Sequence, residues 1–299
     1  MISLPQLRRF LHKTPQQRAE TARFFARRAL SKLPYLPIYV RLFLSSQETT
    51  TFWWSYLPVA DHPGRSLHDY WGDDVEELRF LWRALKPDSS FMDIGAYHGI
   101  YSLIASRRIQ KPGHIVAFEP SPRERQRLHL HFRMNHVSSV VLEPYAVGAQ
   151  CGEAPLFMVV SGFTSMNSLR RPASRDAVQP VAVKTITLDG YLEANRVKRL
   201  DIIKLDAEGG ELEILRGARG MLEDLRPIIL CEVLDWVTGP WGYAARDIVS
   251  HLRDRGYAWF DFRSDGMLSL HAPQDVYPEI RNYLAVPLEK IDTVQEWIQ

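Results

Sequence analysis

The chain has 299 residues, an ordinary balance of hydrophobic and charged side chains, and a net charge of +2. This composition excludes a disordered or collagen-like protein and gives no electrostatic reason to expect a nucleic-acid partner. The length suffices for one large domain with an appendage. Because Cys151 and Cys231 are the only cysteines, we expect no disulfide framework and predict a cytoplasmic protein.

Residues 1–73 are predicted to form a basic, aromatic-rich helical extension before a main domain at residues 74–299. Residues 1–50 hold nine basic and two acidic side chains, and from Pro15 onward alanines and leucines recur at helical spacing between arginines. The predicted amphipathic helix either packs on the main domain or gives peripheral contact, through residues 1–44, with the inner face of a membrane. The apolar run at 33–44 is too short to cross a bilayer.

From residue 74 onward, apolar runs alternate with helical patterns. Helices are predicted at 74–85, 100–108, 123–135, 188–195, 211–222 and 244–255, and strands at 91–94, 115–118, 140–143, 156–160, 181–183, 201–205, 228–230, 258–261 and 283–286. Strands that alternate with helices indicate a mostly parallel sheet covered on both faces. We therefore predict a doubly wound, Rossmann-like α/β fold with a seven-stranded sheet and ligands at the carboxyl ends of its strands.

The first two strands of the main domain carry a pattern that suits a nucleoside ligand. Asp93 and Gly95 end the first strand, Gly99 opens the following helix, and Glu119 ends the second strand. Glycines let the backbone approach a ligand, and a carboxylate at the second strand tip accepts hydrogen bonds from ribose hydroxyls. The third glycine of a dinucleotide fingerprint is missing, and Asp93 would repel a pyrophosphate. The pattern therefore favours S-adenosylmethionine over NAD, although Asp93 taken singly is also explained as a turn or capping residue.

A second group of acidic residues follows the later strands. Asp206 ends one strand, Glu208 lies in the glycine-flanked turn after it, and Glu232 ends the next strand. Because the carboxyl ends of parallel strands meet at one edge of the sheet, we expect these three carboxylates to converge. They are candidates for a general base, or for a divalent-metal site with Asp206 and Glu232 as ligands.

Four further polar residues have both a functional and a structural interpretation. His98, beside the expected methyl donor, is a second candidate for the base, although a histidine in a helix-start turn is often only a cap. Glu211 is interpreted as a first-turn acid that complements the helix dipole. Asn167 and Ser168 lie in a polar loop, where they either contact a ligand or are ordinary surface residues.

Four motifs in this order resemble the FkbM family of S-adenosylmethionine-dependent methyltransferases. They are residues 93–102, 117–122, 146–148 and 203–211, and with Leu188-Asp189 and the strand through Glu232 the resemblance spans about residues 74–286. Two positions depart from it. The family commonly has Asn where Tyr97 stands and Val where Ala207 stands.

The resemblance implies a class I methyltransferase-like fold and methyl transfer to a hydroxyl of a sugar, glycolipid or secondary metabolite, with a small molecule or glycoconjugate as the acceptor. The cofactor is expected to contact Asp93, Gly95, Ala96, Tyr97, Gly99, Glu119 and Ala146. The alternatives that remain open are an NAD-type oxidoreductase and a non-catalytic, membrane-associated binding module that keeps the fold.

Overall fold

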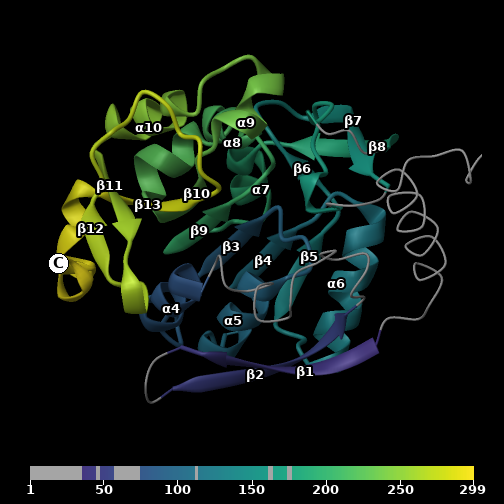
Figure 1. Ribbon diagram of the computed structural model, residues 1–299, viewed down its shortest axis with the longest axis horizontal. Helices are drawn as coiled ribbons and strands as arrows, with labels where there is room; N and C mark the ends of the chain where they lie inside the picture. The colour runs from purple at the N-terminus through teal and green to yellow at the C-terminus, as the bar shows by residue number, and fades with distance from the viewer. Residues whose placement is uncertain (1–35, 45–47, 57–74, 112–113, 161–163, 174–176) are drawn as a thin grey trace, which may run out of the picture.

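The centre of the molecule is a large twisted sheet with helices on both faces (Figure 1). The structure is a computed structural model, and it describes residues 36–44, 48–56, 75–111, 114–160, 164–173 and 177–299. The strand order of this sheet is β12-β11-β13-β10-β9-β3-β4-β5. The predicted doubly wound α/β fold is confirmed. Among the described residues the sheet has eight strands rather than the predicted seven, because β12 (Leu268–Leu270) adds an edge strand beside β11 (Tyr257–Phe262).

Most strands of this sheet run in the same direction, so their carboxyl ends lie at one edge. The parallel strands on either side of the centre are β3 (Phe91–Ile94), β4 (Ile115–Phe118), β5 (Val140–Glu143), β9 (Ile202–Leu205) and β10 (Ile228–Glu232). Strand β13 (Asn282–Pro287) runs antiparallel between β10 and β11. The central strands are buried along their whole length, which explains their nearly continuous apolar sequences.

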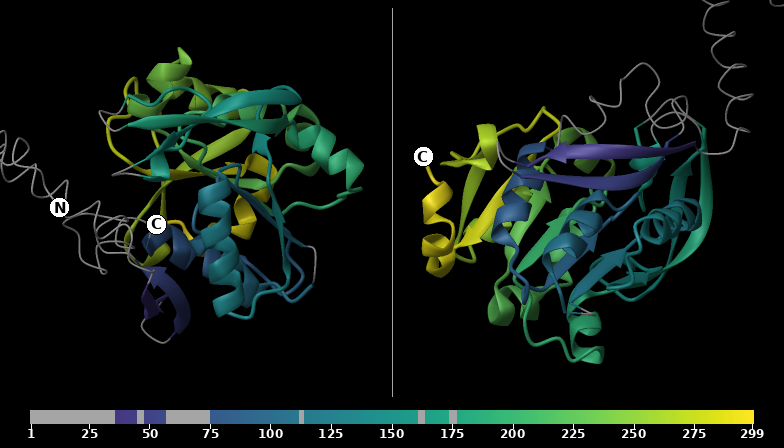
Figure 2. Two further views of the ribbon diagram at one scale, coloured as in Figure 1. Left: turned by 90° about the vertical axis from the view of Figure 1, so that its right-hand side faces the viewer. Right: turned by 90° about the horizontal axis from the view of Figure 1, so that it is seen from below.

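Each face of the large sheet has its own hydrophobic core and helical layer (Figure 2). Helices α4 (Val75–Ala84), α5 (Ile100–Arg108) and α6 (Pro122–Met134) cover one face, and α7 (Leu188–Ala194), α8 (Glu211–Arg216) and α10 (Arg246–Arg253) cover the other. The short helix α9 (Asp235–Thr238) follows β10. The helix predicted at 211–222 is interrupted, since α8 ends at Arg216 and a π-helical turn follows at Met221–Leu225. Among the described residues, no helix has the length and apolarity needed to cross a membrane.

A second, three-stranded sheet stands above the carboxyl edge of the large one (Figure 1). Its strands are β6 (Ala146–Val147), β7 (Gly152–Val159) and β8 (Val178–Ile186), in the order β6-β8-β7. The connection from β7 to β8 contains a short 3₁₀ turn at Thr164–Met166. This sheet therefore brings its connecting loop toward the edge where the parallel strands end.

The described part of the N-terminal extension is a β-hairpin, so the prediction of a helical extension is wrong for these residues. Strands β1 (Leu36–Phe43) and β2 (Thr49–Tyr56) pair antiparallel. The helix predicted from Pro15 onward lies outside the described residues, as does most of the segment for which membrane contact is predicted. The boundary at residue 74 stays a prediction.

The hairpin is fastened to α6 by polar and aromatic contacts. The Ser55 hydroxyl lies 2.6 Å from His131 Nε2, and the Trp53 backbone N–H donates to the Asn135 side chain at 2.8 Å. The Trp54 indole stacks on the His131 ring with the centroids 3.8 Å apart. Burial lowers the pKa of His131 to about 3, so this ring is neutral at physiological pH and packs as an aromatic surface.

Replacing Trp54 by Ala should therefore detach the hairpin. Trp54 is 1% exposed, and removing a buried Trp side chain lowers the free energy of unfolding by about 3–5 kcal/mol. Trp53 is the matched control, because it is the neighbouring residue on the same strand and is 45% exposed. Trp53→Ala should lower stability by less than about 1 kcal/mol. Urea unfolding of both variants measures the difference, and equal effects would contradict the docking of β2 on α6.

Candidate active site

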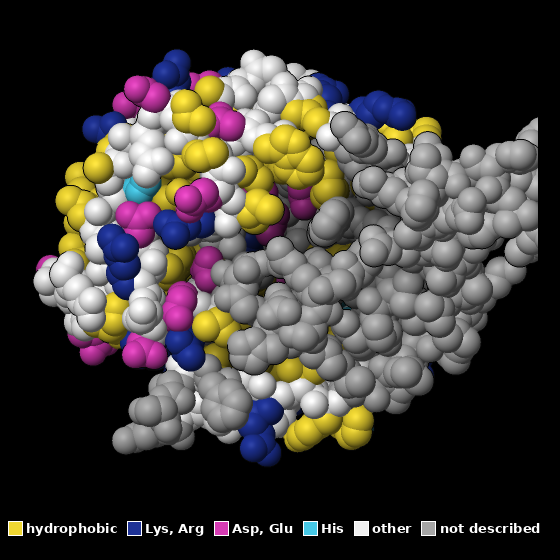
Figure 3. Space-filling model, in the orientation of Figure 1, with side chains coloured by type: hydrophobic (Ala, Val, Ile, Leu, Met, Phe, Trp, Pro, Cys, Tyr) yellow, Lys and Arg dark blue, Asp and Glu magenta, His cyan; other side chains and the backbone are white. Residues whose placement is uncertain are grey.

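A cavity of about 230 Å³ lies at the carboxyl edge of β3, β4 and β9. Its lining comes from the loops after these strands, the start of the helix at Ile100–Arg108, the second sheet with its connecting loop, Trp241, and Trp54 of the hairpin. In the space-filling view, acidic side chains are recessed among hydrophobic ones near the centre of the molecule (Figure 3). The cavity occupies the position at which a doubly wound sheet binds its ligands.

The turn between β3 and α5 is held against the loop after β9 by a close backbone contact. Gly95 has φ +77°, a left-handed conformation that glycine adopts without strain. A Cβ built at Gly95 would lie 1.8 Å from the Asp206 carbonyl oxygen. Only glycine fits here, so Gly95 lets the turn after β3 pack directly against the loop after β9 at the cavity wall.

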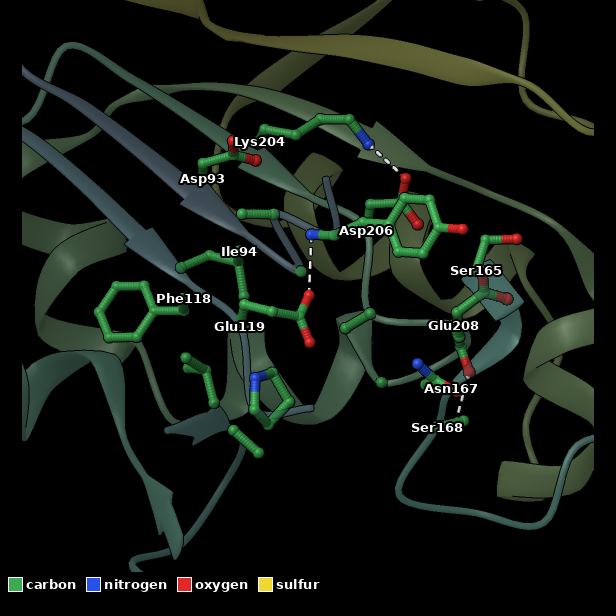
Figure 4. A pocket seen from close by; sticks show the side chains of 18 of the residues that line it. Asp93, Ile94, Phe118, Glu119, Ser165, Asn167, Ser168, Lys204, Asp206 and Glu208 are labelled. Carbon is green, nitrogen blue, oxygen red and sulfur yellow. Dashed lines mark hydrogen bonds and ion pairs between the residues drawn. The ribbon is translucent and has the colours of Figure 1, made fainter. Parts of the chain in front are cut away.

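Glu119 holds the same turn from the side of β4. One carboxylate oxygen accepts a hydrogen bond from the Tyr97 backbone N–H and the other from the Ser121 backbone N–H, each at 2.8 Å (Figure 4). Burial, reinforced by the neighbouring Glu124, raises the pKa of Glu119 to about 8. Glu119 also lines the cavity, and in its ionised form each oxygen has a second acceptor lone pair.

Asp93 is buried at the end of β3. One of its oxygens accepts hydrogen bonds from the Ser102 hydroxyl at 2.6 Å and the Ser102 backbone N–H at 3.1 Å, which ties β3 to helix α5. Burial raises the pKa of Asp93 to about 6, against the lowering effects of Ser102 and the Lys204 ammonium. The residue therefore combines a structural contact with a carboxylate on the cavity wall.

His98 lies in the cavity wall as part of a buried polar network. Its Nε2 is 2.9 Å from a Glu124 carboxylate oxygen, and its ring stacks on Tyr97 with the centroids 3.5 Å apart. Its carbonyl oxygen is 2.8 Å from His131 Nδ1, which links it to the contacts that hold the hairpin. These contacts give His98 a structural role, and its role as a base stays a prediction.

Of the three carboxylates predicted to converge after the later strands, Asp206 and Glu232 do so together with Glu211, whereas Glu208 is not part of this group. Asp206, Glu232 and Glu211 each place a carboxylate oxygen within 4.8 Å of the other two. Lys204, which is 1% exposed, donates from Nζ to Asp206 at 2.8 Å (Figure 4). We call these three acids and Lys204 the carboxylate cluster. The sequence interpretation of Glu211 as a dipole-complementing acid missed its place in the cluster.

Burial and mutual repulsion raise the pKa values in this cluster. The pKa of Glu211 rises to about 7, mainly by burial. The pKa of Glu232 and that of Glu208 lie well above the usual range, chiefly because burial disfavours their ionised forms and because Asp206 and Glu211 repel both charges. Carboxyl groups with raised pKa values that face a cleft are typical of functional sites.

Asn167 and Ser168, in the loop between β7 and β8, lie at one side of the cavity and are held there by hydrogen bonds to β7 and to the turn at Glu208. Asn167 accepts a hydrogen bond from the Val159 backbone N–H at 2.9 Å, and the Ser168 hydroxyl donates to the Glu208 carbonyl at 2.8 Å. Both residues line the cavity, as does Ala146 of β6. Asn167 and Ser168 thus shape the site, and direct contact with a ligand stays a prediction.

The methyltransferase FkbM domain model matches residues 93–258, which is more than half of the chain. The chain belongs to this family. With its strand order, this makes the fold a class I methyltransferase-like α/β fold. The match begins at Asp93 and contains every cavity residue discussed above except Trp54 of the hairpin.

Two curated relatives are similar over about half of the chain. The hexuronic acid methyltransferase AglP of Haloferax volcanii is 24% identical over 157 residues, covering 52% of this chain and 61% of AglP. Methyltransferase 1 of Beauveria bassiana is 26% identical over 166 residues, covering 50% of this chain and 66% of that protein. The chain thus spans less than two thirds of either relative.

Solved methyltransferase structures are also similar. The methyltransferase FkbM of Methylobacillus flagellatus KT is 16% identical with a TM-score of 0.41, over 66% of this chain and 43% of that one. A putative SAM-dependent methyltransferase of Streptococcus mutans is 12% identical with a TM-score of 0.42, over 84% of this chain and 55% of that one.

Replacing Gly95 by Ala should disrupt the turn. The left-handed conformation costs an L-residue about 1–2 kcal/mol, and the contact with the Asp206 carbonyl adds a backbone clash. We expect a loss of at least about 2 kcal/mol in the free energy of unfolding. Gly148→Ala is the control, because a Cβ at Gly148 meets no atom within 4 Å. Chemical unfolding of both variants checks this, and an unaffected Gly95→Ala protein would refute the close contact.

Glu119 should make the ligand-free protein less stable as the pH rises from about 4.5 to 8. Its pKa is about 8 when folded and near 4.5 when unfolded, so in this range only the unfolded chain has released the proton. Below about 4.5 both states are protonated and the full stability is retained. One such group gives a slope of up to about 1.4 kcal/mol per pH unit. Unfolding measured between pH 5 and 8 should show a shallower slope for Glu119→Gln, and an unchanged slope would contradict the raised pKa.

Proposed function

We propose that this protein is an S-adenosylmethionine-dependent O-methyltransferase that acts on a hydroxyl of a sugar, in a glycolipid, another glycoconjugate or a secondary metabolite. The observation that carries the proposal is the cavity in which Asp93, Glu119 and Asp206 meet, in a chain of the FkbM family. The sugar class is supported by AglP, which is named a hexuronic acid methyltransferase.

The cavity residues fit S-adenosylmethionine on three counts. The close contact at Gly95 brings the turn after β3 and the loop after β9 together, so that Asp93 and Asp206 line one cavity. Asp93 offers a negative charge for the ammonium of the methionine part, and burial strengthens this interaction. Glu119, at the tip of the neighbouring strand, lines the same cavity and in its ionised form would accept hydrogen bonds from the ribose hydroxyls.

The chemistry asked of the protein is chiefly positioning. S-adenosylmethionine, when bound, supplies a methyl group on a sulfonium, so that the leaving thioether is neutral and needs no acid. The acceptor oxygen must be aligned with this carbon while it loses its proton. The O–CH₃ bond forms as the S–CH₃ bond breaks, and Asp206 takes the hydroxyl proton as general base.

Asp206 suits this role better than its neighbours. Its carboxyl is 35% exposed, whereas Glu211 is fully buried. The Lys204 ammonium donates to one Asp206 oxygen at 2.8 Å and so fixes the orientation of the carboxyl group. Asp206 therefore lines the cavity with one oxygen held by Lys204.

Cofactor binding separates this proposal from an NAD-type oxidoreductase. S-adenosylhomocysteine should raise the melting temperature of the protein, and NAD should leave it unchanged, because Asp93 repels a pyrophosphate. A thermal shift with both ligands measures this. Stabilisation by NAD alone would overturn the proposal.

Asp206→Asn should keep cofactor binding and lose turnover. Loss of a general base reduces kcat by about 10²–10⁴-fold, while S-adenosylhomocysteine affinity should change little. The assay is transfer of labelled methyl from S-adenosylmethionine to hexuronic-acid-containing glycoconjugates. Asp224→Asn is the control, because Asp224 is exposed and lies outside the cavity. Unchanged kcat in Asp206→Asn would remove this residue as the base.

A further inference from the structure

The carboxylate cluster gathers three acids from neighbouring elements of the fold. Asp206 follows β9, Glu232 ends β10, and Glu211 opens α8, the helix that begins shortly after β9. Strands β9 and β10 are parallel neighbours, so their carboxyl ends are adjacent. One carboxylate oxygen from each acid lies within 4.8 Å of the other two.

Two oxygens in this cluster are buried without a hydrogen-bond donor. Glu211 is 0% exposed, and its Oε1 accepts from the backbone N–H of Ala207 at 2.7 Å and of Gly209 at 3.3 Å. Its Oε2 receives no hydrogen bond from any described residue, and the same holds for Glu232 Oε2. A buried carboxylate oxygen without a partner is strongly unfavourable. The cluster thus offers oxygen atoms for which the described chain supplies no positive partner.

The ionised form of the cluster has an excess of negative charge that equals the charge of one divalent cation. Among the described residues, Lys204 is the cationic side chain that forms an ion pair with it, through Asp206. Metal binding requires deprotonated ligands, and with all three carboxyl groups ionised the three carboxylates and one ammonium carry a net charge of −2. Glu208 lies in the turn between Asp206 and Glu211, and its ionised form would add to the repulsion. A divalent cation would neutralise the three acids without displacing Lys204.

The spacing and the donor atoms indicate a hard cation. Opposite ligands of Mg²⁺ lie about 4.2 Å apart and those of Ca²⁺ about 4.6–5.2 Å, which matches a cluster whose ligand atoms lie within 4.8 Å of each other. All three ligands are carboxylates, and no described histidine or cysteine belongs to the group, so Zn²⁺ has no preferred donor here.

We propose that Asp206, Glu211 and Glu232 bind one Mg²⁺ or Mn²⁺ ion beside the cavity. Asp206 lines the cavity, so an ion on its carboxylate would be within reach of an acceptor that enters there. This extends the proposed function and rests on it for the ion's role: an ion held by these three carboxylates would lower the pKa of an acceptor hydroxyl and so ease the loss of its proton. Binding of the ion itself does not depend on that function.

Direct binding of Mn²⁺ tests the proposal. The electron paramagnetic resonance signal of free Mn²⁺, titrated with the full-length protein at neutral pH, should report one bound ion per chain, displaced by Mg²⁺. Glu232→Gln and Glu211→Gln should each weaken binding tenfold or more, because each removes a charged ligand. Gln keeps the carbonyl oxygen that Glu211 uses to hold Ala207 and Gly209, so that variant retains its structural contact.

Glu213→Gln is the matched control. Glu213 lies on the same helix and is paired with Arg216 outside the cluster, so its Mn²⁺ affinity should equal that of the unmodified protein. Equal affinity in all three variants would overturn the site. So would the absence of bound Mn²⁺ at millimolar concentration, which would mean that the buried acids share protons instead.

S-adenosylhomocysteine binding, measured on the same samples, separates the two proposals and reports folding. Protein that binds S-adenosylhomocysteine but no Mn²⁺ contradicts only the metal site. Protein that binds Mn²⁺ but no S-adenosylhomocysteine contradicts the methyltransferase function and leaves the ion site standing. Cluster variants that keep S-adenosylhomocysteine binding are folded, so a loss of Mn²⁺ in them belongs to the site.

Discussion

The parallel pairing of β3 with β9 is the constraint on which the site depends. Ile94 pairs with Leu205, the Asp206 backbone N–H donates to the Ile94 carbonyl at 3.1 Å, and Gly95 then touches the Asp206 carbonyl. The register of β3 against β9 therefore places the turn after β3 beside the loop that carries Asp206. A shift by one residue would turn every side chain of the strand to the opposite face and separate the two halves of the site.

The second constraint is the excess of buried acid at this edge. Asp93, Glu119, Glu211 and Glu232 all have raised pKa values, because burial disfavours their ionised forms. Backbone N–H groups, the Ser102 hydroxyl and Lys204 offset only part of this. A site of this kind gains most from a ligand that brings positive charge. A sulfonium, an ammonium and a divalent cation all meet that requirement, so the two proposals share one electrostatic basis.

The sequence predicts most accurately those elements that a clear local pattern marks at both ends. The strands at Phe91–Ile94 and Ile115–Phe118 and the helix at Ile100–Arg108 have the predicted bounds, because short apolar runs end at acids and glycines. The hairpin was missed because its strands follow a basic helical pattern, although Thr49–Tyr56 is rich in the β-branched and aromatic residues of strands. The position of Glu211 was misread because an acid in a first helical turn has a sufficient local explanation, and only the pairing of β9 with β10 brings it to Glu232.

Tyr97 stands where the resemblance to the family leads us to expect asparagine. Its φ of +49° lies in the left-handed region, which asparagine adopts more readily than a bulky aromatic residue. Three contacts compensate for the strain: the backbone N–H donates to Glu119, the ring stacks on His98, and the hydroxyl lies 2.7 Å from that of Thr164. The last contact reaches the loop between β7 and β8, a span that an asparagine side chain is too short to cover. The tyrosine thus connects the turn between β3 and α5 directly to the loop between β7 and β8. Both segments line the cavity, so this contact makes the shape of the cavity depend on how they sit relative to each other.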